Sequence, residues 1–144
     1  MAPRLSSEEV DAFLDSKPGW IVLTSIGADG YPHSVPLGYV RDGDRVLCGV
    51  RDNTTKVRNI EANPQVSLLV EAGSTMQDIK GVMLQGDARV HRAPAAVLDC
   101  MRIAARRRGV AEEALPTEPR PGAVYIEVRP ARRISWDYGK DTRQ

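Results

Sequence analysis

The chain has 144 residues, 42% of them hydrophobic and 27% charged, and its net charge is +1. This length predicts one domain with its own core, and the balanced charge argues against a nucleic-acid-binding module or a polybasic membrane anchor. No apolar run is long enough to span a membrane, the N-terminus lacks the apolar region of a secretory signal, and the cysteines lack CxxC spacing. We therefore expect a cytoplasmic protein without membrane, nucleic-acid or metal partners.

Three helices are predicted, two short and one long. Ser6 and Glu9 have the spacing of a capping box, so the first helix begins there and runs to about Asp15, before Pro18. The long helix has Pro94 near its start, where a missing N–H costs nothing. The expected helices cover residues 6–15, 55–62 and 93–108.

Strands are predicted wherever short apolar or alternating runs are separated by turn residues such as Asp29-Gly30 and Asp42-Gly43. The first strand is expected to be buried because Trp20 to Thr24 is a continuous run of β-formers, and Pro36 marks the second strand as an edge or a bulge. The expected strands cover residues 20–24, 33–40, 45–50, 66–70, 79–91, 123–128 and 134–138.

Short antiparallel strands joined by tight turns, with few helices between them, suggest a closed barrel. The fold class is therefore mainly β with α, in a single domain spanning residues 1–144. A small barrel has no room inside for a cofactor, so a ligand is expected on its outside or between subunits.

The segment from Arg51 to Asn59 runs from a polar loop into the start of a predicted helix. Helix starts have free N–H groups and bind anions, and Thr54, Thr55 and Lys56 add further phosphate donors. Lys56 stands out because arginine outnumbers lysine 16 to 4, an excess that itself indicates the codon bias of a high-GC genome. The plainer alternative is that Thr54 caps the helix and Lys56 is solvated.

Three other segments are candidates for ligand contacts. His33-Ser34-Val35 lies between two prolines, which suits main-chain contacts to a planar ligand or simply marks a barrel edge. In the strand that begins at Lys80-Gly81, glycines allow either a ligand to approach closely or a bulge that curves the barrel. Trp136 belongs either to the core or to a pocket of a partner subunit.

Several motifs of enzyme chemistry are absent from the sequence. It contains no GxSxG, P-loop, HExxH or GxGxxG in a βαβ context, so hydrolase, kinase and Rossmann functions lose support. An enzyme without a protein nucleophile usually takes its chemistry from a cofactor. No residue stands out as a catalytic acid or base.

Four segments in order resemble the flavin-binding split-barrel family related to pyridoxamine 5′-phosphate oxidase, which includes flavin- and deazaflavin-dependent oxidoreductases. Residues 20–36 look like its opening hairpin, and residues 54–64 look like its signature of a lysine followed seven residues later by Asn-Pro. Residues 80–88 look like its long central strand, and residues 134–137 like its closing strand.

The resemblance implies a six- or seven-stranded antiparallel split β-barrel that forms a homodimer with two cofactor sites at the interface. Lys56 falls at the position of the family's phosphate-binding lysine, with Arg51, Thr54 and Thr55 in the phosphate loop. The strand 33–35 would line the cofactor, Lys80 and Gly81 would pass its ring, and Trp136 would complete the cofactor-binding set.

The chain departs from true pyridoxamine phosphate oxidases at two places. Thr55 replaces an arginine directly before the lysine, and the C-terminal segment Trp136 to Lys140 replaces a substrate motif rich in arginine and histidine. We therefore expect another substrate. FMN and F420 both offer a phosphate to Lys56, the high-GC composition favours F420 slightly, and haem, with only His33 and His91 as imidazole ligands, is the third choice.

Three functions compete. The first is an FMN- or F420-dependent oxidoreductase that transfers hydride to or from a small molecule. The second is a non-catalytic protein that carries or sequesters flavin, F420 or haem. The third is a small interaction domain with a vestigial site, which predicts no cofactor binding.

Overall fold

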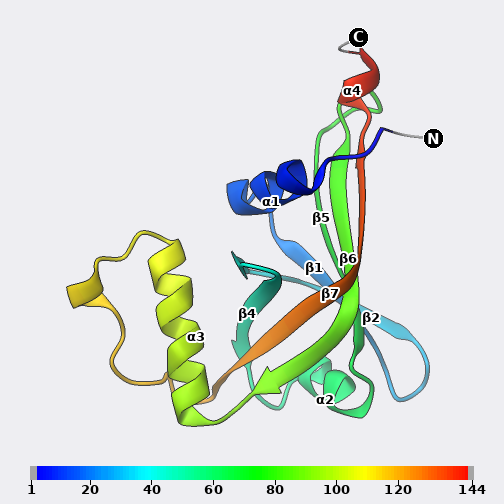
Figure 1. Cartoon of the computed structure of the whole chain (residues 1–144). Coiled ribbons are helices and arrows are strands. Elements are labelled where there is room, and N and C mark those ends of the chain that lie inside the picture. Colours follow the sequence, from blue (N-terminus) through cyan, green and yellow to red (C-terminus); the bar gives the residue numbers. More distant parts are fainter. Residues whose placement is uncertain (1–2, 143–144) are drawn as a thin grey trace.

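The computed structural model describes residues 3–142 (Figure 1). The helices are α1 (Ser7–Ser16), α2 (Thr55–Ala62), α3 (Pro94–Arg107), the 3₁₀ helix η1 (Glu112–Ala114) and α4 (Gly139–Thr142). The strands are β1 (Ile21–Ile26), β2 (Pro32–Leu37), β3 (Val40–Asp42), β4 (Arg45–Arg51), β5 (Gln65–Ala72), β6 (Lys80–His91) and β7 (Ala123–Asp137). The strands form one antiparallel sheet, around which α1, α2 and α3 pack, while α4 projects beyond the end of the sheet.

The helix predictions are confirmed because local signals set the helix ends. Ser6 accepts a hydrogen bond from the Glu9 N–H at 3.1 Å, and the Glu9 carboxylate accepts one from the Ser6 N–H at 2.8 Å, which completes the capping box. α2 has the predicted bounds, and Pro94 occupies the first turn of α3. Gly109 follows α3 with a φ of 87°, a left-handed conformation that suits glycine.

The sheet has the order β2-β1-β5-β6-β7-β4-β3 and all its described pairings are antiparallel. The two end strands, β2 and β3, do not pair with each other in the part of the chain that the structure describes. The barrel is therefore split rather than closed, as the family resemblance implies. Pro36 lies in the edge strand β2 opposite Val22, so its missing N–H interrupts no interior ladder.

Three strand predictions are wrong. The expected strand 33–40 is divided, because β2 ends at Leu37 and pairs with β1, whereas β3 begins at Val40 and pairs with β4. Residues 123–137 form one bent strand instead of two, because β7 pairs with β4 from Ala123 to Val128 and with β6 from Tyr125 to Asp137. The bend coincides with a register shift between Gln85 and Gly86, where a Cβ on Gly86 would lie 2.5 Å from the Arg129 carbonyl oxygen. This glycine therefore serves the bulge, which was the structural alternative for it.

Trp20 is also not part of a buried strand, because 70% of its surface is exposed. β1 begins at Ile21, and its register directs Ile21, Leu23 and Ser25 into the core. A continuous apolar run does not reveal that only one of its two faces is covered.

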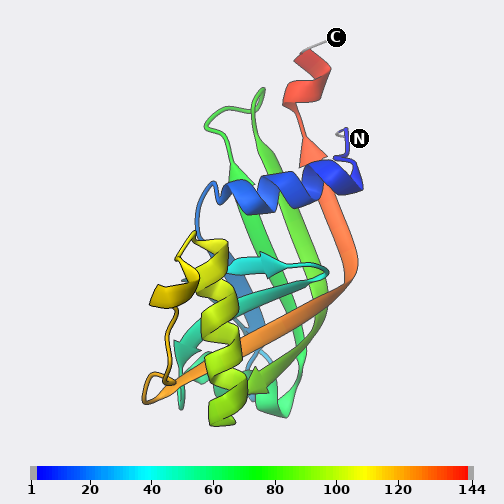
Figure 2. The ribbon, with the colours of Figure 1, turned by 60° about the vertical axis from the view of Figure 1, so that its left-hand side comes forward.

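The core has two parts, one on each side of β4. The larger part fills the inside of the curl and is covered by α1 and α2, with Leu14, Val57 and Ile60 among its buried residues. The smaller part lies between α3 and strands β3, β4 and β7, around Cys100 and Tyr125. Figure 2 shows α1 across one end of the curl and α3 along its outside. Within residues 3–142, no helix has the length and apolar character that a membrane span needs.

Candidate functional site

The loop between β4 and α2, where the sequence predicts an anion site, is held in shape by hydrogen bonds. Asp52 donates its N–H to the Gly122 carbonyl at 3.0 Å, and Asn53 has a left-handed φ of 59°. The Thr54 hydroxyl donates to the Arg51 carbonyl at 3.1 Å and makes no cap to the helix. The N–H groups of the first turn of α2 are therefore left without an acceptor from Thr54, contrary to the plainer alternative.

Lys56 lies in this first turn and is half-buried. Its ammonium group has no hydrogen-bond or ion-pair partner among the residues that the structure describes. The nearby acids are already neutralised, because Arg92 bonds Asp52 at 2.9 Å and Glu61 at 2.6 Å. These hydrogen bonds also hold the pKa of both carboxyl groups below their ordinary values. The start of α2 therefore has a net positive character suited to an anion.

The predicted residues of β2 divide between the two faces of the sheet. Val35 and His33 lie opposite Leu23 and Ser25, two core-facing residues of β1, whereas the Ser34 hydroxyl lies 2.8 Å from that of Thr24 on the other face. The Nδ1 atom of His33 is buried and has no partner within the described chain. Such an unsatisfied nitrogen is a polar group that a ligand or water could complete.

His33 is connected to α2 through one intermediate residue. Ser25, its register partner on β1, accepts a hydrogen bond from the Asn59 side chain of α2 at 3.1 Å, and both Ser25 and Asn59 are buried. The fold thus brings β2 and α2, which are distant in the sequence, to the same end of the sheet (Figure 1).

Lys80, Gly81 and Trp136 lie elsewhere in the same chain. α2 ends beside Ala88, whose N–H donates to the Pro64 carbonyl, and Lys80 lies eight residues further along β6. At about 3.3 Å per residue, this separation along the strand is roughly 26 Å. One chain alone therefore does not bring these three residues to the start of α2.

The far end of β6 has its own local packing. Gly81 lies opposite Trp136, and a Cβ on Gly81 would be 2.5 Å from the indole ring. The missing side chain therefore allows the indole to lie against β6. The Lys80 ammonium is 5.3 Å from the centre of the Phe13 ring of α1, a cation–π distance.

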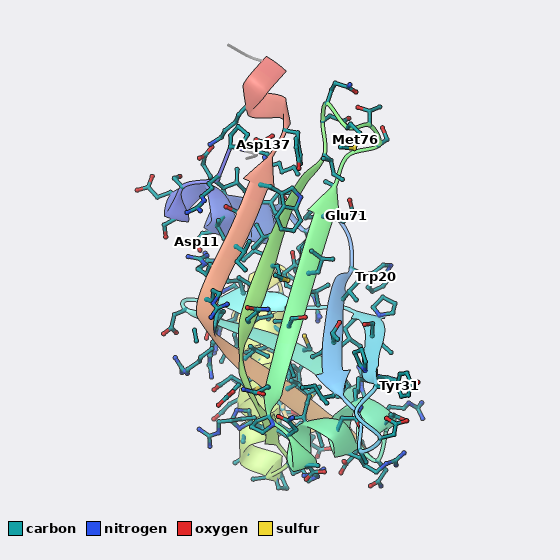
Figure 3. All side chains as sticks on the ribbon, turned by 90° about the vertical axis from the view of Figure 1, so that its right-hand side faces the viewer. Asp11, Trp20, Tyr31, Glu71, Met76 and Asp137 are labelled. Carbon is teal, nitrogen blue, oxygen red and sulfur yellow. The ribbon has the colours of Figure 1, made fainter. Side chains whose placement is uncertain are left out.

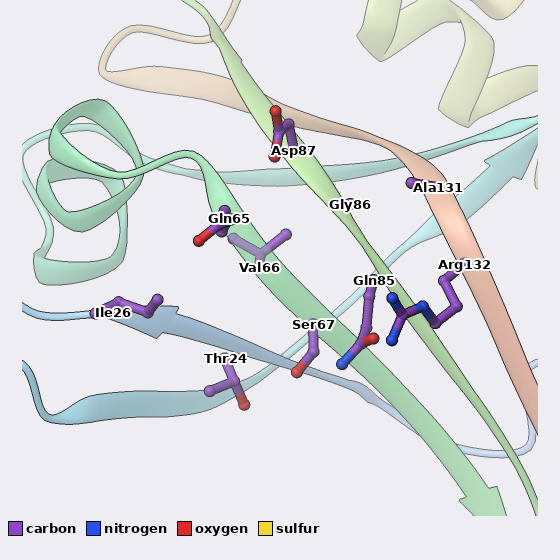
Figure 4. Close-up of a pocket in the computed structure, with 10 residues that line it drawn as sticks. All are labelled: Thr24, Ile26, Gln65, Val66, Ser67, Gln85, Gly86, Asp87, Ala131 and Arg132. Atoms are coloured by element: carbon purple, nitrogen blue, oxygen red, sulfur yellow. The ribbon is translucent and has the colours of Figure 1, made fainter.

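A polar row that no sequence pattern predicted crosses the open face of the sheet, the face turned away from the core. Pairing in register places Ser34, Thr24, Ser67, Gln85 and Arg132 side by side on five strands. Most of this row lines a hollow of about 440 Å³ (Figure 4). The alternation of polar and apolar residues within each strand indicates which residues lie on the open face. Only the register between strands shows that these polar residues form one row.

A second hollow of about 740 Å³ lies between β4, α3 and the connector 111–122. It begins at the candidate anion site, because Arg51 and Asn53 line it. Gly49 lies under the Tyr125 ring, which a Cβ at that position would meet at 3.1 Å. No group of three or more histidine, cysteine, aspartate or glutamate side chains in the described chain is arranged to hold a metal ion.

The protein is thus a curled, split β-barrel with a basic, uncapped helix start at its rim. The sequence profile described as pyridoxamine 5′-phosphate oxidase matches residues 6–137. The chain therefore belongs to the pyridoxamine 5′-phosphate oxidase family. A search of curated protein sequences finds no match.

Solved structures show the same fold. A conserved hypothetical protein from Mycobacterium tuberculosis has a TM-score of 0.81 at 24% identity, covering 96% of this chain and 88% of that chain. A haem storage protein from Vibrio cholerae has a TM-score of 0.70 at 16% identity, covering 95% and 99%. An F420 reductase has a TM-score of 0.58 at 23% identity, covering 84% and 93%. At these identities the likeness shows the fold alone.

Proposed function

We propose that this protein is an FMN- or F420-dependent oxidoreductase that transfers hydride to or from a small molecule in the cytoplasm. The observation that carries the proposal is the start of α2, where Lys56 has no partner among residues 3–142 and Thr54 leaves the first turn uncapped. When bound, the flavin or deazaflavin supplies the hydride chemistry at its ring. The family membership agrees with this function.

The chain's own residues bind and orient the cofactor. Lys56 neutralises its phosphate, and the first-turn N–H groups of α2, the Thr55 hydroxyl and Arg51 surround that phosphate. Thr54 holds the loop in shape through its hydrogen bond to the Arg51 carbonyl. The buried Nδ1 atom of His33 gains a partner when the site is filled.

The site is completed by a second copy of the chain. Three of the predicted site residues lie too far along β6 and β7 to reach α2 of their own chain, namely Lys80, Gly81 and Trp136. Register places the apolar residues Leu69, Met83 and Ile134 beside the polar row on the open face of the sheet. This is the face turned to the viewer in Figure 3, and such a face is suited to a homodimer interface. In this homodimer the three residues of one protomer reach the α2 site of its partner.

The test is a titration of the purified full-length protein with FMN, F420 and haem, followed by absorption and fluorescence. Saturable binding of FMN or F420 is expected, and Lys56→Ala should weaken it about tenfold or more because the phosphate loses its charge partner. Arg89→Ala is the matched control, since Arg89 is exposed on β6 and likewise lacks a described partner. Unchanged affinity in Lys56→Ala would contradict this assignment, and binding of no cofactor would favour the vestigial domain.

A non-catalytic carrier is the second candidate, favoured by the absence of an evident acid or base in the described site. Of the two histidines, His91 contacts the buried Glu127 at 3.4 Å, whereas His33 has a ring nitrogen without a partner. A haem carrier would therefore use His33, and His33→Ala would abolish the haem spectrum. Tight cofactor binding without hydride transfer to a broad panel of acceptors would establish the carrier.

A further inference from the structure

The second hollow of about 740 Å³, between β4, α3 and the connector 111–122, is a cleft whose sides are joined by hydrogen bonds and an ion pair. Arg102 of α3 donates to the Pro116 carbonyl at 3.2 Å, and Arg106 pairs with Glu112 at 2.9 Å, so the connector is fastened to the helix. Leu115 is buried between these two contacts. The far end of the connector is held by the hydrogen bond from the Asp52 N–H to Gly122.

Three arginines without protein partners line this cleft: Arg51, Arg108 and Arg120. No hydrogen bond or ion pair of their side chains is found within the described chain. Their neighbours differ, because Arg106 and Arg107, directly before Arg108, bond Glu112 and Asp42. Cations are favourable at the C-terminus of any helix, and this effect would apply equally to all three consecutive arginines. It therefore does not explain why Arg108 alone is left without a partner among the described residues.

Tyr125 provides a second, independent indication of a ligand. It is only 8% exposed and lines the cleft, and its hydroxyl, which is open to solvent, has no partner among the described residues. A Cβ on Gly49 would lie 3.2 Å from this hydroxyl, so the glycine makes room for it. Burial raises the pKa of Tyr125, and the nearby positive charges of Arg108 and Arg120 oppose that rise.

The remaining lining of the cleft is mostly apolar and carries no free negative charge. Met101 and Ala105 of α3 face Pro116 and Pro121 of the connector. The one acid in the lining is Asp52, and Arg92 already neutralises it at 2.9 Å. A ligand for this cleft needs a negative charge at one end and an apolar body.

We propose that the cleft binds the carboxylate of a small, mainly apolar organic acid. Arg108 and Arg120 neutralise the carboxylate, and the Tyr125 hydroxyl donates a hydrogen bond to it. Because the cleft begins at Arg51 and Asn53, the acid lies next to the candidate cofactor site. The further statement that this acid is the hydride-transfer substrate rests on the proposed function. The statement that the cleft binds the acid does not rest on it.

The test is calorimetric titration of the purified full-length protein with phenylacetate, and with phenylacetamide as the neutral analogue of the same shape. Saturable binding of phenylacetate is expected, at least about tenfold tighter than binding of the amide. Arg108→Gln and Arg120→Gln should each weaken it about tenfold, and Tyr125→Phe, which keeps the ring, should weaken it by several-fold. Arg89→Gln should leave it unchanged.

Equal binding of acid and amide, an equal loss in Arg89→Gln, or no saturable binding of phenylacetate would overturn the proposal. Thermal unfolding of each variant identifies any that fails to fold, and Tyr125→Phe remains informative in that event. Titration of the same proteins with FMN and F420 separates the two proposals. Cofactor binding without acid binding refutes only the acid site, and acid binding without cofactor binding refutes only the oxidoreductase.

Discussion

The Thr54 hydroxyl donates to the Arg51 carbonyl at 3.1 Å and therefore does not cap the helix that Thr54 precedes. This contact fastens the loop from β4 into α2 and leaves the first-turn N–H groups available. In a helix selected only for stability, the N-cap side chain would accept hydrogen bonds from these groups. The arrangement costs helix stability, which is consistent with the anion site proposed there.

Thr54→Asp should separate stability from cofactor affinity. A carboxylate at the N-cap accepts from the first turn and interacts well with the helix dipole, so the free energy of unfolding should rise by up to about 1 kcal/mol. The same carboxylate repels a phosphate, so affinity for FMN or F420 should fall about tenfold or more. Chemical denaturation and fluorescence titration measure the two effects. Thr54→Asn, which caps without charge, is the control, and tighter cofactor binding in Thr54→Asp would contradict the phosphate site.

Gly81→Ala should disturb Trp136. The added Cβ would lie 2.5 Å from the indole ring, so the ring must move away from β6. Such overpacking should lower the free energy of unfolding by about 1–3 kcal/mol and shift the tryptophan emission. Gly19→Ala is the control, because nothing lies within 4 Å of a Cβ placed there. An unchanged emission spectrum in Gly81→Ala would show that this packing is absent in solution.

Ile134→Glu should prevent the proposed homodimer from forming. Ile134 is 36% exposed on β7, opposite Met83 of the open face, and a carboxylate there would have to be buried in the interface. Light scattering should then show a monomer, and cofactor affinity should fall with the loss of the second protomer. Val110→Glu changes a residue of similar exposure, 38%, after α3 and should leave the mass unchanged. A monomeric wild-type protein would rule out the shared site.

Glu127→Gln should alter the acid stability of the protein. Burial raises the pKa of Glu127, but hydrogen bonds from Arg45 and His91 outweigh it and hold the pKa below its ordinary value of 4.5. The stabilising contribution is therefore present above about pH 4.5 and is lost as the pH falls through the lower folded-state pKa. The variant should lose about 2 kcal/mol at neutral pH.

Denaturation midpoints measured from pH 7 down to acid would show this change for Glu127. The difference between wild type and Glu127→Gln should shrink as the pH falls. Glu118→Gln is the control, because Glu118 is exposed and has no partner among the described residues. A difference that stays constant with pH would contradict the charged state of Glu127.

The sequence by itself determined the features that depend on neighbouring residues. The capping box at Ser6, the exact range of α2 and the edge position of Pro36 follow from hydrogen-bonding groups and dihedral limits within a few residues. The family and the antiparallel split barrel were also recognisable, since ordered segments such as 54–64 identify them. The cofactor-site residues were proposed on the same basis, and their roles stay predictions.

Only the tertiary structure decided how distant residues meet. It exposes Trp20, joins residues 123–137 into one strand, and separates Lys80 and Trp136 from α2 of the same chain. It also places Arg108 and Arg120 around Tyr125, although consecutive arginines at a helix end look like an ordinary solvated terminus. Sheet register and the packing of α3 make these contacts, and both depend on burial across the whole chain, which no local pattern encodes.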